Sequence, residues 1–450
     1  MSGGSPTRAW FQTFGCKANQ YDTERMRQEL ELSGAVAVAS AERADVAVVN
    51  TCTVTAEADR DARRMIRKLG REHPGLRIVV AGCSAALRES EYTAMDEVWR
   101  VVPGQDAAAV ARAARPLRPA EANGAGLVEL RGSDRALLTH FRRGTRAWLK
   151  VQDGCDRRCS FCATRIARGE SRSRDPDELV REALLLGREH PEIVITGIHI
   201  GHYGLDLAEP VSLAGLCRRL LDEVPDVRLR LGSIEATEID DPLVDLLADS
   251  GGRLAPHLHV PLQSGSDTVL RRMRRWHTRE AYRSRILEIA SRLPYLGLGA
   301  DIITGFPGET DSDHADSRRL VEELPYTYLH VFPFSARPVT EAGNLPNQVP
   351  RRVRAARARD LRELGLSKGM SYRALRLGSR AHVVVETVVE TAAGRGPVSG
   401  EVTEMATGTT EDYLRVEIPA GNGAKGRSVR PGAVLSGLLA GYPDRLQLRA

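Results

Sequence analysis

The sequence predicts an α/β protein in three parts: an N-terminal doubly wound parallel sheet, a central partial (β/α)6 barrel, and a small C-terminal antiparallel β-barrel. Short apolar runs alternate with helical stretches over the first hundred residues, and six further strand candidates follow from residue 146. β-Branched runs separated by Gly and Pro end the chain. With 450 residues, the chain is long enough for two to four domains.

The N-terminal sheet is predicted from three apolar runs and the helical stretches between them. The expected strands are 8–15, 44–51 and 77–82, and the expected helices are 19–33, 56–72 and 84–90. Cys16, Cys52 and Cys83 directly follow the three strands. Because parallel strands end at one edge of a sheet, where open α/β sheets bind ligands, we expect the three thiols to converge.

Residues 105–140 are rich in Ala, Arg, Pro and Gly, and this composition predicts a domain boundary followed by a connector. Beyond it, alternating elements predict the partial barrel, with its chemistry at the C-terminal ends of the strands. The expected strands are 146–152, 192–197, 227–233, 257–263, 298–306 and 328–335. The expected helices are 176–189, 212–223, 240–250, 266–291 and 312–324.

A basic helix over 351–376 is expected to close this domain. The last part is predicted to be a small barrel, a shape often used to bind nucleic acid, with strands at 381–390, 396–405, 412–419 and 433–442. The predicted domains are 1–120, a linker over 121–145, then 146–376 and 377–450.

Composition indicates a globular protein, with 42% hydrophobic and 27% charged residues. No run approaches the roughly 18 apolar residues of a membrane span, and the start MSGGSPTRAW lacks the apolar segment of a signal peptide. We therefore expect a monomeric cytoplasmic protein with no membrane partner. Seven cysteines in such a protein indicate metal ligands or reactive thiols rather than disulfides.

The net charge of +5 is small, but basic residues gather in two segments. Residues 351–380 carry ten basic side chains against Asp360 and Glu363, and 271–285 carries seven arginines against Glu280. Such segments can follow the phosphates of a nucleic acid. Only five of the 64 basic residues are lysine, so an arginine-rich composition with solvated helix faces is an equal alternative.

The segment DGCDRRCSFCATRIARG places Cys155, Cys159 and Cys162 in a loop after the first strand of the central barrel. Three thiolates at this spacing can hold a four-iron four-sulfur cluster and leave one iron open for a ligand. A structural zinc site is the alternative, but zinc almost always takes four ligands, and no fourth lies nearby in the sequence.

This Cys-x3-Cys-x2-Cys loop, with Phe161 before its last cysteine, resembles that of the radical S-adenosylmethionine (SAM) enzymes. The resemblance implies that Cys155, Cys159 and Cys162 are the catalytic cluster ligands and that the open iron binds SAM. In this family, one electron then cleaves SAM to release a 5′-deoxyadenosyl radical. The cluster and SAM supply that chemistry, while the protein positions and shields them.

The segments TFGCKANQYDTE, VVNTCTVTAEADRDARR and VVAGCSA resemble the N-terminal domain of the methylthiotransferases. The resemblance implies that Cys16, Cys52 and Cys83 hold a second four-iron four-sulfur cluster. GCKANQYDTE with NTCTVT is most similar to the branch that acts on N6-threonylcarbamoyladenosine at tRNA position 37. It further implies a C-terminal TRAM-like domain that binds the tRNA anticodon arm, a sulfur donor, and a flavodoxin- or ferredoxin-like electron donor.

Other motifs match the family residue by residue, and they imply contacts with SAM. Thr196 and Gly197 follow the second strand of the barrel, and Glu235 follows the third. Further matches are Gln263 and Ser264, the segment Asp301–Thr310, and Arg168, which corresponds to an arginine that faces the SAM carboxylate. Turn-forming sequence and solvated strand ends are the ordinary alternative for each.

Three functions stay open at this point. The first is a tRNA methylthiotransferase with two clusters, which the basic segments favour. The second is a sister branch that modifies an aspartate of a ribosomal protein, and the third is a non-enzymatic iron–sulfur protein that binds nucleic acid.

Four further features have ordinary structural interpretations. Cys217 is expected to be a buried small hydrophobe. His199 and His202 lie in a turn with no third ligand expected nearby. His257 and His259 share one face of a strand as core or rim residues, and Trp276 is a packing residue or stacks on a base.

Overall fold

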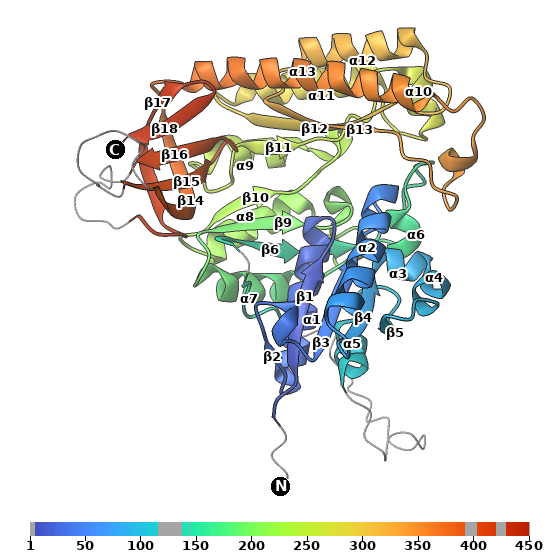
Figure 1. The fold of residues 1–450 in the computed structure, drawn as a ribbon. Coiled ribbons are helices and arrows are strands. Elements are labelled where there is room, and N and C mark those ends of the chain that lie inside the picture. Colours follow the sequence, from blue (N-terminus) through green and yellow to red (C-terminus); the bar gives the residue numbers. More distant parts are fainter. Residues whose placement is uncertain (1–4, 116–136, 143, 392–402, 420–428, 450) are drawn as a thin grey trace, which may run out of the picture. The chain divides into compact units, whose positions relative to one another are not determined.

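The computed structural model describes residues 5–115, 137–142, 144–391, 403–419 and 429–449 (Figure 1). The chain divides into two compact units. Unit 1 comprises Met1–Arg142, Asp153–Arg172 and Ser335–Thr340, and unit 2 comprises Arg143–Gln152, Ser173–Phe334 and Glu341–Ala450. Two short segments from later in the sequence thus belong to the N-terminal unit.

A five-stranded parallel sheet forms the centre of unit 1, in the order β2-β1-β3-β4-β5 (Figure 1). Its strands are β1 (Arg8–Thr13), β2 (Val36–Ala37), β3 (Val46–Thr51), β4 (Arg77–Gly82) and β5 (Val98–Val101). Its helices are α1 (Lys17–Leu32), α2 (Ala56–Glu72), α3 (Cys83–Leu87), α4 (Glu89–Thr93) and α5 (Ala107–Ala114). The predicted doubly wound parallel sheet is confirmed.

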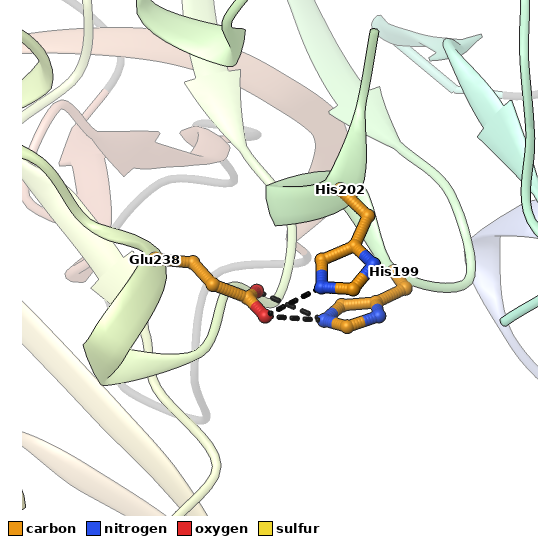
Figure 2. A group of neighbouring side chains, drawn as sticks. All are labelled: His199, His202 and Glu238. Carbon is orange, nitrogen blue, oxygen red and sulfur yellow. Dashed lines mark hydrogen bonds and ion pairs between the residues drawn. The ribbon is translucent and has the colours of Figure 1, made fainter. Parts of the chain in front are cut away.

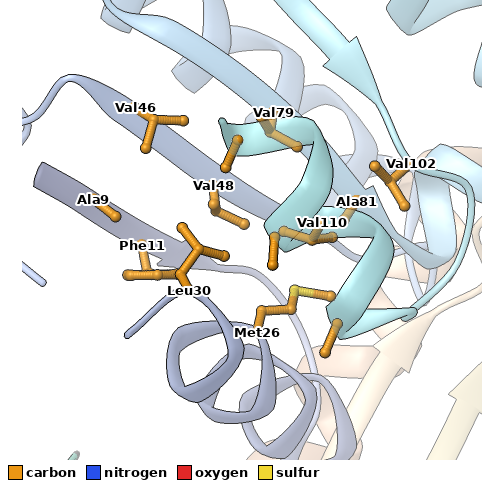
Figure 3. Packing of buried hydrophobic residues seen from close by; sticks show 13 residues of the cluster. Ala9, Phe11, Met26, Leu30, Val46, Val48, Val79, Ala81, Val102 and Val110 are labelled. Atoms are coloured by element: carbon orange, nitrogen blue, oxygen red, sulfur yellow. The ribbon is translucent and has the colours of Figure 1, made fainter. Parts of the chain in front are cut away.

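Apolar cores lie on both faces of this sheet, because alternate residues of each strand point to opposite sides. On one face, Val48 of β3 packs with Met26 of α1 and Val110 of α5 (Figure 3). On the other face, Val49 packs with Ile66 of α2. Every residue of β3 is therefore buried, as expected for a central strand.

The stretch 105–140 differs from the expected connector, because it begins with helix α5. The side chain of Asp106 caps this helix by accepting a hydrogen bond from the Ala109 amide at 2.9 Å, and Val110 is fully buried. The connector prediction is thus wrong for this helix, whose alanines pack closely but carry a weak hydrophobic signal. Residues 116–136 lie outside the described residues.

Unit 2 contains the six predicted strands of the central part, all in parallel pairs. They form two three-stranded sheets, β10-β9-β6 and β11-β12-β13, which isolated parallel bridges connect at Leu229–Leu254 and Ser233–His259. The strands are β6 (Arg146–Lys150), β9 (Glu192–Thr196), β10 (Arg228–Leu231), β11 (His257–His259), β12 (Gly297–Thr304) and β13 (Tyr328–Pro333). An open, partial barrel results.

The helices of unit 2 follow the predicted pattern, with one break. They are α7 (Pro176–Gly187), α8 (Leu213–Glu223), α9 (Asp241–Asp249), α10 (Asp267–Arg272), α11 (Arg279–Arg292), α12 (Asp311–Glu323) and α13 (Arg351–Arg376). The single helix expected over 266–291 is instead α10 and α11, because Arg274 adopts a left-handed φ of 56° and Thr278 caps a new helix. In the described part of the chain, no helix combines the length and hydrophobicity that a membrane span needs.

The C-terminal strands of unit 2 form a closed barrel in the order β14-β15-β16-β18-β17. These are β14 (Arg380–Thr391), β15 (Thr403–Thr410), β16 (Arg415–Pro419), β17 (Val434–Tyr442) and β18 (Arg445–Arg449). The predicted barrel is confirmed. The strand expected over 396–405 lies partly outside the described residues, and β18 was not predicted.

Buried charges attach this barrel to the first sheet of unit 2. Glu192 of β9 accepts hydrogen bonds from Arg228 at 2.6 Å and from Arg230 at 2.7 Å. Arg230 also donates to the carbonyl oxygens of Thr410 and Glu411 at 3.0 and 2.9 Å. Since neither Glu192 nor Arg230 is exposed, the barrel completes the pairing of charges that would otherwise be buried without partners.

Candidate functional site

The first group of thiols lies at the carboxyl edge of the sheet in unit 1. Cys16, Cys52 and Cys83 follow β1, β3 and β4, which are adjacent in the sheet. Cys52 and Cys83 are buried and Cys16 is exposed. We call these three residues the sheet thiols.

A glycine before Cys16 makes room for this group. Gly15 has a φ of +95°, and a Cβ at this position would overlap the Sγ and Cβ atoms of Cys52. The backbone before one thiol therefore passes against the side chain of another, which requires glycine for both its conformation and its size.

Burial keeps the thiols of Cys52 and Cys83 protonated when no metal is present. It raises the pKa of Cys52 to about 12 and that of Cys83 to about 11. Negative charge on Cys16 raises both pKa values further, so the thiols lie close enough to interact. A thiolate here therefore needs a positive partner, which is what a metal centre supplies.

The second group, which we call the loop thiols, is Cys155, Cys159 and Cys162. The Cys155 amide donates to the carbonyl oxygen of Gly169 at 3.0 Å, and the Cys162 amide donates to that of Cys159 at 3.2 Å. The first bond joins the start of the thiol loop to the residue after helix α6 (Thr164–Arg168), and the second forms a turn just before this helix. Burial raises the pKa of Cys155 to about 12, and charge on Cys162 and Cys159 adds to the effect.

The spacing of the ligand atoms distinguishes a site for an iron–sulfur cluster from a site for a single metal ion. Four sulfurs around one zinc ion lie about 3.8 Å apart, given Zn–S bonds of about 2.3 Å. Among the described residues, two groups bring three potential ligand atoms within 4.8 Å of one another, and neither contains a cysteine. In neither group of thiols do all three sulfurs lie within 4.8 Å of one another, and three soft sulfur donors are the ligand chemistry of an iron–sulfur cluster.

Arg168, at the end of α6, contacts the sheet thiols. Its Nε donates to Cys83 Sγ at 3.2 Å, and its Nη1 donates to Asp153 at 2.8 Å. Its Nη2 donates to Asn19 Oδ1 at 2.6 Å and to Asp22 at 2.7 Å. The predicted contact with the SAM carboxylate stays a prediction, while every nitrogen of this guanidinium donates to a side chain within unit 1.

A second buried arginine lies near both groups of thiols. Arg337, in the segment Ser335–Thr340, is 3% exposed, and its Nη1 donates to Thr53 Oγ1 at 3.1 Å. Burial lowers the pKa of Arg337, whereas negative charge on Cys52 and on Cys162 raises it. One sheet thiol and one loop thiol therefore act on the same guanidinium.

The remaining residues predicted to contact SAM are divided between the units. Phe161 lies half-buried in the thiol loop of unit 1. Thr196, Gly197, Glu235, Gln263 and Ser264 lie in unit 2. Their contacts with SAM stay predictions.

Glu235 lies partly buried just after β10, beside an arginine that the sequence did not single out. Its carboxylate accepts a short hydrogen bond from Arg275, whose guanidinium lies 4.2 Å from the centre of the Trp276 ring. Burial raises the pKa of Glu235, and the positive charge of Arg275 opposes that rise. Trp276 donates to Thr237 Oγ1 at 3.1 Å, so its indole is held in place within unit 2.

Thr196 and Gly197 end β9, where the turn is tight. A Cβ at Gly197 would lie 2.8 Å from the carbonyl oxygen of Gln152, so a larger residue would clash. Gln263 has a left-handed φ of 65°, an unusual conformation for a residue with a side chain. Ser264 Oγ lies 3.3 Å from Ser317 Oγ.

Figure 2 shows a group of metal-ligating type that was not expected, His199, His202 and Glu238. His199 Nε2 lies 2.8 Å from the Glu238 carboxylate, and His202 Nε2 lies 3.3 Å from it. The expectation of no third ligand near these histidines is therefore wrong. Glu238 lies in the turn after β10, whereas the two histidines lie in the turn after β9. The sequence spacing of the histidines therefore gives no indication of this third residue.

His259, Asp301 and His330 form a similar group at the second sheet of unit 2. Burial raises the pKa of Asp301, but hydrogen bonds from His259 and His330 outweigh it and hold this pKa well below its usual value. His257 and His259 share one face, as expected, and both lie within hydrogen-bond distance of the Tyr328 hydroxyl, at 2.8 and 3.1 Å. Cys217 is fully buried in α8, as predicted.

Two parts of the chain match known families. Residues 8–104 match the Uncharacterized protein family UPF0004, and residues 149–321 match the Radical SAM superfamily.

Curated relatives match most of the chain. The Threonylcarbamoyladenosine tRNA methylthiotransferase MtaB of Rickettsia prowazekii is 36% identical over 83% of this chain and 86% of its own length. The protein of the same name in Bacillus subtilis is 35% identical over 96% of this chain and 94% of its own length. The tRNA-2-methylthio-N(6)-dimethylallyladenosine synthase of Novosphingobium aromaticivorans is 33% identical over 86% and 88%.

A solved structure shares the fold. The radical S-adenosylmethionine methyltransferase TsrM from Kitasatospora setae superposes with a TM-score of 0.54 and 17% sequence identity. The match covers 79% of this chain and 84% of that one. The fold is therefore of the radical SAM type.

Proposed function

This chain belongs to the radical SAM methylthiotransferase family, and we propose that it inserts sulfur and a methyl group at carbon 2 of N6-threonylcarbamoyladenosine at tRNA position 37. The cofactors of the family are SAM and four-iron four-sulfur clusters. An aromatic C–H bond is not acidic enough for acid–base catalysis, so its replacement calls for a radical. The observation that carries the proposal is the presence of two separate three-thiol groups in unit 1.

Each group of thiols would hold one cluster. The loop thiols Cys155, Cys159 and Cys162 would hold the cluster that binds SAM, and the sheet thiols Cys16, Cys52 and Cys83 would hold the second. When bound, the first cluster supplies the electron that cleaves SAM, and the second carries or activates the sulfur that is inserted. The chain would supply three ligands in each case, and such a ligand set would leave one iron of each cluster without a protein ligand.

Residues of the chain would bind and orient SAM, through side chains or, at Gly197, through the backbone. We assign this role to Phe161, Thr196, Gly197, Gln263 and Ser264. Glu235 joins them, because a largely buried carboxylate held by Arg275 is rigid enough to receive a hydroxyl or amino group of the cofactor.

These assignments give each predicted domain a proposed role. Residues 1–120 would carry the second cluster, 121–145 would link the domains, 146–376 would carry the radical chemistry, and 377–450 would bind the tRNA anticodon arm. The compact units divide the chain differently, because the thiol loop belongs to unit 1. The relatives named as tRNA enzymes support the choice of RNA over a ribosomal protein.

Helix α13 offers exposed positive charge for the RNA. Arg351, Arg352 and Arg359 are exposed, whereas Arg357 and Arg376 are buried in ion pairs and do not contribute. A variant with Arg351, Arg352 and Arg359 changed to Ala should bind tRNA more weakly. Its log–log salt slope should fall by about 0.7 for each phosphate that the variant no longer neutralises. The matched control is Arg64→Ala, because Arg64 is 78% exposed on α2.

Mass spectrometry of tRNA nucleosides tests the function directly. A deletion strain should lack the methylthio form of N6-threonylcarbamoyladenosine, and the wild-type gene should restore it. Genes encoding Cys159→Ala or Cys52→Ala should not restore it, whereas Cys217→Ala should, because Cys217 is buried in α8 of unit 2 and belongs to neither group. Loss of the methylthio form of N6-dimethylallyladenosine, or an unchanged nucleoside profile, would contradict the proposed substrate.

A further inference from the structure

The buried guanidinium of Arg168 connects the loop that carries one group of thiols to the other group. Its side chain is fully buried. Arg168 lies six residues after Cys162 and next to Gly169, whose carbonyl oxygen accepts the hydrogen bond from the Cys155 amide. The arginine is therefore part of the folded thiol loop, while its Nε donates to the sheet thiol Cys83.

The partners of Arg168 hold it in one orientation. Asn19 Nδ2 donates to the carbonyl oxygens of Phe14 and Thr51, both at 2.9 Å, which leaves Asn19 Oδ1 facing the guanidinium. Asp22, 2% exposed, pairs with the Nη2 of Arg168. Asn19 and Asp22 on α1 hold Nη2, and Asp153 holds Nη1, so the guanidinium points its Nε toward the sulfur.

The sulfur of Cys83 has a second donor. Gln105 Nε2 donates to Cys83 Sγ at 3.3 Å, close to the 3.2 Å of the arginine bond. Hydrogen bonds to ligand sulfurs and nearby positive charge raise the reduction potential of an iron–sulfur cluster, because both stabilise the electron added on reduction. Of the two donors, Arg168 brings a full positive charge and Gln105 brings none.

We propose that Arg168 is a positioning residue for the cluster on the sheet thiols, which donates a hydrogen bond to the Cys83 ligand and raises the reduction potential of that cluster. This inference rests on the proposed function, because it requires a cluster on Cys16, Cys52 and Cys83. It makes the redox state of one cluster depend on the folding of the loop that holds the other. Arg337 should affect the potential of this cluster less than Arg168 does. It acts on Cys52 through its charge, and its described hydrogen bond goes to Thr53.

The test uses the full chain with the loop thiols changed to Ala, so that only the sheet thiols can bind a cluster. This parent variant should bind about four irons per chain after anaerobic reconstitution. Absence of iron from the parent would contradict the two-cluster function itself, and would do so before Arg168 is altered. The potential is measured by redox titration followed by electron paramagnetic resonance.

In this parent, Arg168→Gln should lower the midpoint potential of the cluster, and Arg168→Lys should lower it less because the charge remains. Gln105→Leu should lower it by a smaller amount than Arg168→Gln. The control Arg172→Gln changes an exposed arginine of the same segment and should leave the potential unchanged. An unchanged potential in Arg168→Gln with full iron content would overturn the proposal.

A charge-balanced variant answers the objection that Arg168→Gln leaves Asp22 buried without its partner. Arg168→Gln with Asp22→Asn removes one positive and one negative charge together. Its potential should still lie below that of Asp22→Asn alone, because the bond to sulfur is broken in one and kept in the other. Equal potentials in these two variants would overturn the proposal. Loss of iron from a folded double variant would also overturn the proposal, because Arg168 would then be needed for cluster binding and not for the potential.

Discussion

The two groups of thiols in unit 1 reach the same number of sulfurs by different routes. The loop thiols lie within eight residues of sequence, and their geometry depends on local hydrogen bonds such as that from Cys162 to Cys159. The sheet thiols span residues 16–83 and meet because β1, β3 and β4 are parallel neighbours. One group therefore depends on a single loop, and the other on the topology of a whole domain.

Single cysteine changes should separate the two groups most strongly. Cys159→Ala should remove about half of the roughly eight irons per chain and abolish reductive cleavage of SAM. Cys52→Ala should remove the other half and spare cleavage of SAM in the absence of tRNA. Iron analysis and chromatography of 5′-deoxyadenosine measure both effects.

Cys217→Ala is the control for these changes, because Cys217 is fully buried in α8 of unit 2. It should retain the full iron content. Cleavage of SAM by Cys159→Ala would refute the role assigned to Cys159. A loss of all iron from either variant would mean that the groups are not independent.

Glycine-to-alanine changes should disturb each group through its own backbone. Gly15→Ala would place a Cβ against Cys52, and Gly154→Ala would place one against the carbonyl oxygen of Glu170. Each should cost more than the about 1 kcal/mol typical of alanine at a left-handed position, because a steric overlap adds to the strain. Gly15→Ala should lower the iron bound by the sheet thiols, and Gly154→Ala that of the loop thiols.

Gly34→Ala isolates the contribution of conformation, since Gly34 has a φ of +88° with open space around it. Thermal unfolding should therefore register a small loss of stability for Gly34→Ala, with unchanged iron content. If Gly15→Ala behaves like Gly34→Ala, close approach to Cys52 does not matter for the sheet thiols.

Alkylation of the metal-free protein should give the smallest difference between the groups. Cys52 has a pKa of about 12 and Cys155 also has a pKa of about 12. At pH 8 only about one in ten thousand of such groups is a thiolate, so their labelling should rise about tenfold per pH unit up to pH 10. Cys16 is exposed and should react first.

Mass spectrometry of peptides after iodoacetamide treatment measures the order of reaction, with the unfolded chain as the reference for full reactivity. Rapid labelling of Cys52 at pH 8 would mean that the sheet edge is open in the metal-free protein.

The loop thiols and the strand positions could be predicted from sequence because both depend on short-range patterns. Cysteine spacing identifies the loop, and apolar runs identify β1, β3 and β4. Convergence of the sheet thiols also follows from a simple rule on parallel strands. Helix α5 and strand β18 were not predicted, because their packing is decided by partners elsewhere in the fold.

The surroundings of the candidate site depend on contacts between distant residues, which the sequence does not display. Asn19 and Asp22 lie 149 and 146 residues from Arg168 in the chain. Glu238 lies 39 residues from His199. Each of these partners is an ordinary polar residue in a helix or turn, and nothing in its own neighbourhood distinguishes it.

The attachment of the C-terminal barrel to the first sheet of unit 2 has a consequence for substrate selection. Arg230 donates to backbone oxygens of the barrel, and Arg376 at the end of α13 donates to Asp412 at 2.7 Å. The barrel is therefore held in a fixed position on the rest of unit 2. An RNA held by it would meet the strand ends of unit 2 at a constant separation. The enzyme would then choose its nucleotide by measuring along the RNA as well as by recognising the base.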